Sequence, residues 1–242
     1  MTAVAWDGVG ERLAAVVTAG GKVISRSRVL VFSRTGERVG RISGEPDVEI
    51  RSLSFRGDGD VVATTARTAR DDPTGWGVRL WDWRHDRIIE RIEGNAVGVA
   101  FDPAGEMLIT SRLIEGVADV WNAQNGERVS SLEGHGGIVT DVAFDATGTR
   151  TATASTDGTV RIWDPSTGRQ QATLRLALPV SASGVSFTPD GKRLVTTWAD
   201  GITRIWTLDL DELVDIAKNR LTRGLTSVEC ERYLHVDTCP PA

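Results

Sequence analysis

The chain has 242 residues, 40% of them hydrophobic, which is enough for a sizeable buried core, and a net charge of −5. This acidic balance argues against a nucleic-acid-binding surface, and no stretch approaches the roughly 20 apolar residues of a membrane helix. The first residues lack the basic start of a signal peptide, and two cysteines make no disulfide framework, so we expect a soluble cytoplasmic protein.

Two series of aromatic residues recur along the chain. In the first series, each aromatic is followed four residues later by glycine, at intervals of 49, 46, 43 and 43 residues: Trp6/Gly10, Phe55/Gly59, Phe101/Gly105, Phe144/Gly148 and Phe187/Gly191. In the second series, each aromatic ends a Val/Ile/Leu-rich run, at intervals of 49, 40, 42 and 43 residues: Phe32, Trp81, Trp121, Trp163 and Trp206. A nearly fixed period predicts one architecture built by repetition.

The clearest copy covers residues 134–164 and reads GHGGIVTDVAFDATGTRTATASTDGTVRIWD. Over residues 138–144, Ile138, Thr140, Val142 and Phe144 alternate with Val139, Asp141 and Ala143, which indicates the two faces of a β-strand. Asp157-Gly158 supplies a tight hairpin turn, because glycine tolerates the positive φ that such turns require. The copy therefore predicts short antiparallel strands joined by turns.

With its Gly-His opening, its Trp-Asp close and its period, the chain resembles the WD40-repeat β-propeller family over residues 1–207. The resemblance implies an all-β propeller of about five blades, which could be open or incomplete. It also implies a hydrogen-bonded structural relay in the fourth unit, formed by His135, Ser155, Asp157 and Trp163. The other units lack the Gly-His pair, so we expect those blades to rely on packing alone.

The strand count leaves three outcomes open: a closed ring of five blades, an open arc completed by another chain, or a fragment of a longer protein. The first predicted strand, at residues 2–6, has no spare strand before it, and Trp206 runs directly into a predicted helix. The fifth blade is therefore expected to lack its outer strand. We favour an open or strained arc, which could associate with itself through its open blade edges.

Residues 208–242 are predicted to form a C-terminal helical extension. Leu210, Leu213, Val214, Ala217 and Leu221 form one apolar stripe, and Asp209 or Asp211 can cap the helix. A second, shorter helix is predicted at residues 226–234. The tail resembles that of actinobacterial WD40 regulatory proteins linked to an NTPase module.

Two insertions of about seven residues, at 18–28 and 66–77, lie between the second and third strands of the first two units. They are expected on one face of adjacent blades, where they would form a cationic patch with one aromatic residue. Its members are Lys22, Arg26, Arg28, Arg67, Arg70 and Trp76. The patch is a candidate anchor for an acidic protein partner, and the alternative is a pair of solvated loops.

The sequence shows no catalytic, cofactor-binding or metal-ligating constellation. We therefore predict a non-catalytic scaffold for protein–protein interaction in bacterial signalling, with no cofactor and no nucleic-acid or membrane partner. The alternative is a fragment of a larger NTPase-WD40 protein, acting as a sensor or regulatory domain or retained as a non-functional relic.

Overall fold

The computed structural model describes residues 3–19, 26–45, 48–68, 77–112 and 116–220. Within these ranges the chain forms five antiparallel sheets, in which each strand pairs with its neighbour in the sequence. The first four sheets have four strands each, and the fifth has three. The prediction of an all-β propeller of five blades with a short helix after it is confirmed.

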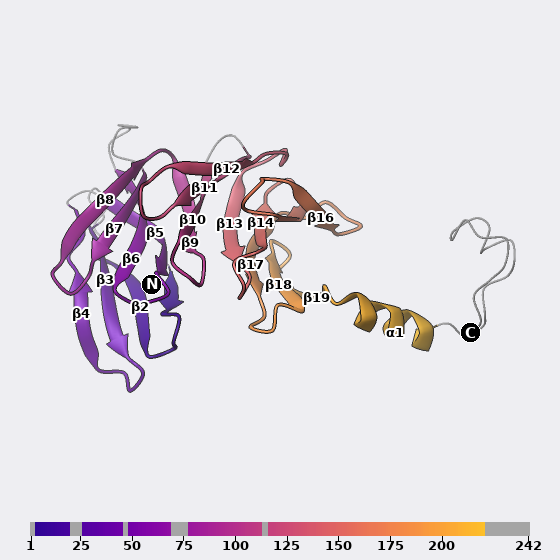
Figure 1. Ribbon diagram of the computed structural model, residues 1–242, viewed down its shortest axis with the longest axis horizontal. Coiled ribbons are helices and arrows are strands. Elements are labelled where there is room, and N and C mark those ends of the chain that lie inside the picture. Colours follow the sequence, from indigo (N-terminus) through magenta and orange to yellow (C-terminus); the bar gives the residue numbers. More distant parts are fainter. Residues whose placement is uncertain (1–2, 20–25, 46–47, 69–76, 113–115, 221–242) are drawn as a thin grey trace, which may run out of the picture. The chain divides into compact units, whose positions relative to one another are not determined.

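The blades follow one another in chain order, from indigo to orange in Figure 1. The first blade contains β1 (Val4–Trp6), β2 (Arg12–Ala19), β3 (Arg26–Ser33) and β4 (Arg38–Ile42). The second contains β5 (Val48–Phe55), β6 (Val61–Thr68), β7 (Gly77–Asp82) and β8 (Arg87–Glu93). The third contains β9 (Ala96–Phe101), β10 (Met107–Arg112), β11 (Ala118–Asn122) and β12 (Arg128–Leu132). The fourth contains β13 (Val139–Phe144), β14 (Thr151–Ser155), β15 (Thr159–Trp163) and β16 (Gln170–Arg175), and the fifth β17 (Ala182–Phe187), β18 (Arg193–Trp198) and β19 (Thr203–Thr207).

A tight turn after each innermost strand explains the spacing between the aromatic residue and the glycine. In the fourth blade, the Gly148 N–H donates to the Asp145 carbonyl (3.1 Å), and the Asp145 N–H donates to the Arg150 carbonyl (2.9 Å). Gly148 has a φ of 71°, a left-handed conformation that residues with a Cβ rarely adopt. The repeated glycine is therefore required by the hairpin between the first and second strands.

The core consists of apolar layers between consecutive blades. One layer joins β10, β11 and β12 of the third blade to β13 and β15 of the fourth, where Val120, Leu132 and Trp163 are almost fully buried. Similar layers lie between the first and second blades and between the second and third. Each buried side chain of this size contributes about 1.5–3 kcal/mol relative to an exposed one, so the blades stabilise one another through these layers.

The innermost strands pack in the order β1, β5, β9, β13 and β17. Together they border a channel of about 690 Å³, whose wall includes residues from all five strands. Side chains of one inner strand bind the backbone of the next: the Val99 N–H donates to Ser52 Oγ (3.2 Å) and the Phe101 N–H to Ser54 Oγ (3.0 Å). These bonds fix the register between neighbouring blades.

The first and fifth blades do not share such a layer within the described residues, because β1 and β17 do not pack together as the other inner strands do. Ile205 is 65% exposed, whereas Ile162, which holds the same place before the strand tryptophan of the fourth blade, is 4% exposed. At the other end, Trp6 of β1 is 54% exposed. Two sheet faces are thus left uncovered, one on each terminal blade.

Residues 1–206 form one compact unit, and residues 207–242 form a second. The helix α1 (Leu210–Arg220) lies in the second unit. Asp209 caps it, because its Oδ1 accepts from the N–H groups of Asp211 (3.0 Å) and Glu212 (3.3 Å). The predicted second helix at 226–234 lies outside the described residues. None of the helices in the described part of the chain has the length and apolar character needed to span a bilayer.

The uncovered face of the fifth blade can be tested with matched substitutions. We expect Ile162→Ala to lower the free energy of unfolding by about 2–4 kcal/mol, because it leaves a cavity between two blades. Ile205→Ala should change it by less than about 0.5 kcal/mol, because no blade covers that side chain. Urea unfolding of both variants measures the difference, and equal losses would show that Ile205 is covered.

Candidate functional site

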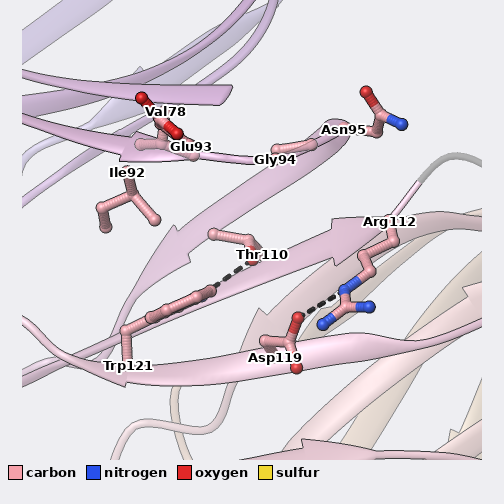
Figure 2. A pocket seen from close by; sticks show the side chains of 10 residues that line it. Val78, Ile92, Glu93, Gly94, Asn95, Thr110, Arg112, Asp119 and Trp121 are labelled. Atoms are coloured by element: carbon pink, nitrogen blue, oxygen red, sulfur yellow. Dashed lines mark hydrogen bonds and ion pairs between the residues drawn. The ribbon is translucent and has the colours of Figure 1, made fainter. Parts of the chain in front are cut away.

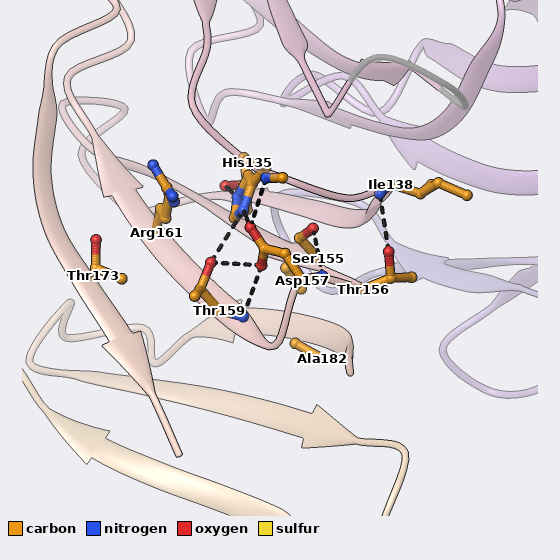
Figure 3. Close-up of polar contacts among 12 residues, drawn as sticks. His135, Ile138, Ser155, Thr156, Asp157, Thr159, Arg161, Thr173 and Ala182 are labelled. Atoms are coloured by element: carbon orange, nitrogen blue, oxygen red, sulfur yellow. Dashed lines mark hydrogen bonds and ion pairs between the residues drawn. The ribbon is translucent and has the colours of Figure 1, made fainter. Parts of the chain in front are cut away.

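The polar centre of the fourth blade is a buried histidine held between two strands (Figure 3). His135 Nδ1 lies 2.9 Å from Asp157 Oδ2, and Nε2 lies 2.7 Å from Thr153 Oγ1. Trp163 Nε1 also donates to Thr153 Oγ1 (2.9 Å). An ionised carboxylate only accepts hydrogen bonds, so a neutral His135 carries its proton on Nδ1, and the Thr153 hydroxyl donates to Nε2.

The electrostatics of this relay keep the imidazole neutral and the carboxylate ionised. Burial lowers the pKa of His135, and although Asp157 works in the opposite direction, the net shift is downward. Burial alone would raise the pKa of Asp157. Hydrogen bonds from Thr159, His135 and the Gly136 N–H outweigh that effect and bring the pKa of Asp157 to about 2. The arrangement ties the loop before β13 to the hairpin between β14 and β15.

Of the four relay residues named from the sequence, His135, Asp157 and Trp163 are brought together, whereas Ser155 lies one position along the same face of β14. Its Oγ accepts from the Asp157 N–H (3.1 Å) and so supports the turn. Thr153 is the hydroxyl that joins the histidine to the tryptophan. Both hydroxyls lie on one face of the strand because they are two residues apart, which the sequence pattern alone does not distinguish.

A threonine–tryptophan hydrogen bond recurs in three other blades, which sequence reasoning missed. In each, the indole N–H donates to a threonine Oγ1 of the second strand: Trp81 to Thr64 (2.9 Å), Trp121 to Thr110 (2.9 Å) and Trp206 to Thr196 (2.8 Å). The expectation that these blades rely on packing alone is therefore wrong. The signal was present, since Thr110, Thr153 and Thr196 are spaced by 43 residues. The first blade has Ala15 and Phe32 at these positions.

The position of His135 is filled differently in the second blade. Glu45 follows a glycine two residues after the end of β4, as His135 follows a glycine two residues after the end of β12. Its carboxylate binds Arg79 Nε (2.8 Å) and Arg91 Nη2 (2.8 Å). Burial would raise the pKa of Glu45, but the two arginines outweigh it and lower the pKa. An ion pair replaces the imidazole here.

In the third blade the same position is hollow. A cavity of about 310 Å³ lies between the second and third blades, bordered by Gly94, Asn95, Thr110 and Trp121 (Figure 2). Asp119 and Arg112 form a further part of the wall, with Arg112 Nε 2.6 Å from Asp119 Oδ2. Ser131 Oγ also donates to Asp119 Oδ1 (2.6 Å), so the buried carboxylate is well compensated.

The channel wall carries one carboxyl group with an unusual pKa. Asp141 of β13 accepts from the Val185 N–H of β17 (Oδ2, 3.0 Å) and from the Val142 N–H (Oδ1, 3.0 Å). Burial raises the pKa of Asp141 to about 6, against the opposite effect of these two hydrogen bonds. Asp141 thus joins the inner strands of the fourth and fifth blades through a group that titrates near neutral pH.

The predicted cationic patch falls at two hairpins of the first and second blades. Residues 20–25 interrupt the β2–β3 hairpin and 69–76 the β6–β7 hairpin, so Lys22, Arg70 and Trp76 lie outside the described residues. Arg26 begins β3, and Arg28, two residues on, is exposed. Arg67 lies on β6 opposite Glu49 of β5 and is half-buried. The geometry places the described members on hairpins of adjacent blades.

Comparison with known proteins identifies the repeat. Residues 126–164 and 177–207 match the family model of the WD domain, G-beta repeat. These segments contain the first three strands of the fourth and fifth blades, so these two blades match the WD repeat.

Relatives match part of the chain. Eukaryotic translation initiation factor 3 subunit I is 39% identical over 28% of this chain and 21% of the relative in Caenorhabditis elegans, and 34% identical over 43% and 30% in Danio rerio. Periodic tryptophan protein 2 of Saccharomyces cerevisiae is 35% identical over 36% of this chain and 9% of the relative. The chain thus spans less than a third of the length of each of these relatives.

The relay can be tested at its central hydroxyl. We expect Thr153→Val to lower the free energy of unfolding by about 2–4 kcal/mol, because it leaves a buried imidazole nitrogen and a buried indole N–H without partners. Ser155→Ala should cost less than half as much, since only the Asp157 N–H loses its partner. Denaturant unfolding compares the two, and a larger loss for Ser155→Ala would overturn the assignment of Thr153.

The raised pKa of Asp141 predicts that the stability of the folded chain depends on pH. Its folded-state pKa lies above the ordinary value of 3.8, so the folded chain holds this proton up to about pH 6 and loses stability as the pH rises through that window. Asp141→Asn cannot titrate. As the pH rises from 4.5 to 7.5, the free energy of unfolding of the variant should increase by about 1–2 kcal/mol relative to that of the parent.

Urea midpoints at four pH values measure this difference. His135 titrates in both proteins and therefore cancels in the comparison. A difference between variant and parent that stays constant with pH would contradict the raised pKa of Asp141.

Proposed function

We propose that this chain is a non-catalytic scaffold that mediates protein–protein interaction through the loops of its propeller. The observation that carries the proposal is the combination of WD repeats with five antiparallel sheets in which each strand pairs with its neighbour in the sequence. A rigid framework of this kind holds loops in fixed positions, and binding residues concentrate on such loops.

The first and second blades supply the surface that we propose as the binding site. β2 and β3 pack against β5, so the β2–β3 and β6–β7 hairpins belong to adjacent sheets. Arg28 and Arg67 lie near the ends of these hairpins, and Lys22, Arg26, Arg70 and Trp76 belong to the same two segments of the sequence. Clustered positive charge favours a partner with an acidic segment, because complementary charge steers encounter and fixes register.

The wider setting that we propose is bacterial signalling in the cytoplasm. Its support is the resemblance of the tail, including α1, to the tails of NTPase-linked regulatory proteins. The second candidate function, a sensor or regulatory domain of such a larger protein, rests on the same tail. Self-association through an open edge is a further part of the proposal, supported by β19, which pairs only with β18 among the described strands.

A charge-reversal experiment tests the binding face. We expect Arg28→Glu combined with Arg67→Glu to reduce capture of a recurrent partner in native lysate at least fivefold, measured by cross-linking and mass spectrometry. Arg169→Glu is the matched control, because Arg169 is exposed in the β15–β16 hairpin, at the opposite end of its blade. Equal losses for both variants, or no recurrent partner for the parent, would contradict the proposal.

A further inference from the structure

The cavity between the second and third blades occupies the place that the histidine relay fills one blade later. Thr110 and Trp121 of the third blade correspond to Thr153 and Trp163 of the fourth, with the same indole-to-hydroxyl hydrogen bond of 2.9 Å in both. In both blades the threonine pairs across the sheet with the residue two before the tryptophan, Asp119 in one and Arg161 in the other. The two sites therefore share strand register as well as residue type.

In the third blade the histidine is replaced by another residue, and the loop that follows this position is shorter. The loop length can be measured from the outer strand of one blade to the aromatic residue that ends the inner strand of the next. Ile92 of β8 and Phe101 of β9 are nine residues apart, whereas the corresponding Leu132 of β12 and Phe144 of β13 are twelve apart. Asn95 stands at the place of His135, two residues after Glu93 as His135 is two after Glu133. A loop shortened by three residues leaves an open space of about 310 Å³ at this position.

The wall of this space carries a threonine hydroxyl that accepts one hydrogen bond but has no acceptor for its own proton among the described residues. In the fourth blade the hydroxyl of Thr153 accepts from the indole and donates to His135 Nε2. Thr110 is 5% exposed and borders the cavity, and the Trp121 indole is its one hydrogen-bond partner in the described part of the chain. Its hydroxyl proton therefore has no acceptor there, and a buried donor of this kind favours an acceptor placed in the cavity.

Part of the remaining wall fits a flat ring, and the rest is charged, with Glu93 and the Arg112–Asp119 ion pair. His135 meets the Trp163 ring edge-on, with centroids 6.1 Å apart and an interplanar angle of 62°. Trp121 is half-buried, whereas Trp163, which is covered by the histidine, is 1% exposed. Val78 and Ile92 add apolar surface on the side of the second blade. A volume of about 310 Å³ lies at the lower end of the range for small-molecule sites, roughly 300–1,000 Å³.

We propose that this cavity binds a small, neutral, planar nitrogen heterocycle of one or two rings. Its unprotonated ring nitrogen accepts from the Thr110 hydroxyl, and its ring edge contacts Trp121. The ligand takes the place of the imidazole that the fourth blade supplies from its own chain. This site is independent of the proposed binding face, because it lies between blades and uses none of those arginines.

Benzimidazole and indole form a matched pair of probes at pH 7.5. They have nearly the same size and shape, but indole has no ring nitrogen that accepts a hydrogen bond. We expect benzimidazole to shift the Trp121 indole N–H resonance of the full chain labelled with ¹⁵N-tryptophan. It should bind about fivefold more tightly than indole, the factor that about 1 kcal/mol represents.

Thr110→Val should abolish this preference, whereas Thr196→Val should leave it unchanged, because Thr196 makes the same bond to Trp206 beside no described cavity of this kind. Replacing residues 95–96 with the sequence of residues 135–139 restores the loop length and supplies a histidine, so the graft should exclude benzimidazole. The graft keeps the test valid if Thr110→Val fails to fold.

Three results would overturn the inference. One is the absence of any benzimidazole-induced shift at Trp121 in the parent chain. The others are equal affinities for benzimidazole and indole, and full benzimidazole binding in a folded graft.

Discussion

The sheets of this chain are stabilised mainly by the neighbouring sheets that cover their faces. The clusters of buried apolar residues lie between consecutive blades: the first and second, the second and third, and the third and fourth. Burial of apolar surface is the largest favourable contribution to folding, so this stacking dictates the order of the blades. The same constraint explains the exposed apolar side chains at the two ends, such as Trp6 and Ile205.

The second, third and fourth blades differ in what occupies the space beside the strand tryptophan. The gap above the strand tryptophan is filled by a histidine in the fourth blade, by a glutamate with two arginines in the second and by open space in the third. The threonine–tryptophan bond is common to these three blades, so it is the constant part of the design. The variable part is the loop between blades, whose length decides whether a side chain reaches the gap.

Much of the fold could be predicted from the sequence because repetition amplifies weak signals. Phe144 with Gly148, and the four other pairs like it, marked every inner strand and its turn. Asp157 and Trp163 both lie next to His135, at the turn and the strand end whose positions the repeat fixes.

The remaining features depend on properties that a residue pattern does not encode. Ser155 and Thr153 share a strand face, and only the direction of the Trp163 indole decides between them. The Glu45–Arg79 pair joins residues 34 positions apart, and the cavity beside Thr110 arises from a shortened loop. The ion pair has no sequence signature of its own, and the shortened loop is visible in the sequence only as a reduced spacing between Ile92 and Phe101. The raised pKa of Asp141 depends on its burial between two inner strands.

Hydrogen exchange of the tryptophan indole N–H groups tests the central claim, that each blade is covered by the one before it and the first is uncovered. The account predicts strong protection for Trp163 and Trp81, which are 1% and 5% exposed and hydrogen-bonded to threonines. Trp6, at 54% exposure, should exchange as fast as a free indole. Protection of Trp6 equal to that of Trp163 would contradict the account, because another sheet would then have to cover the first blade.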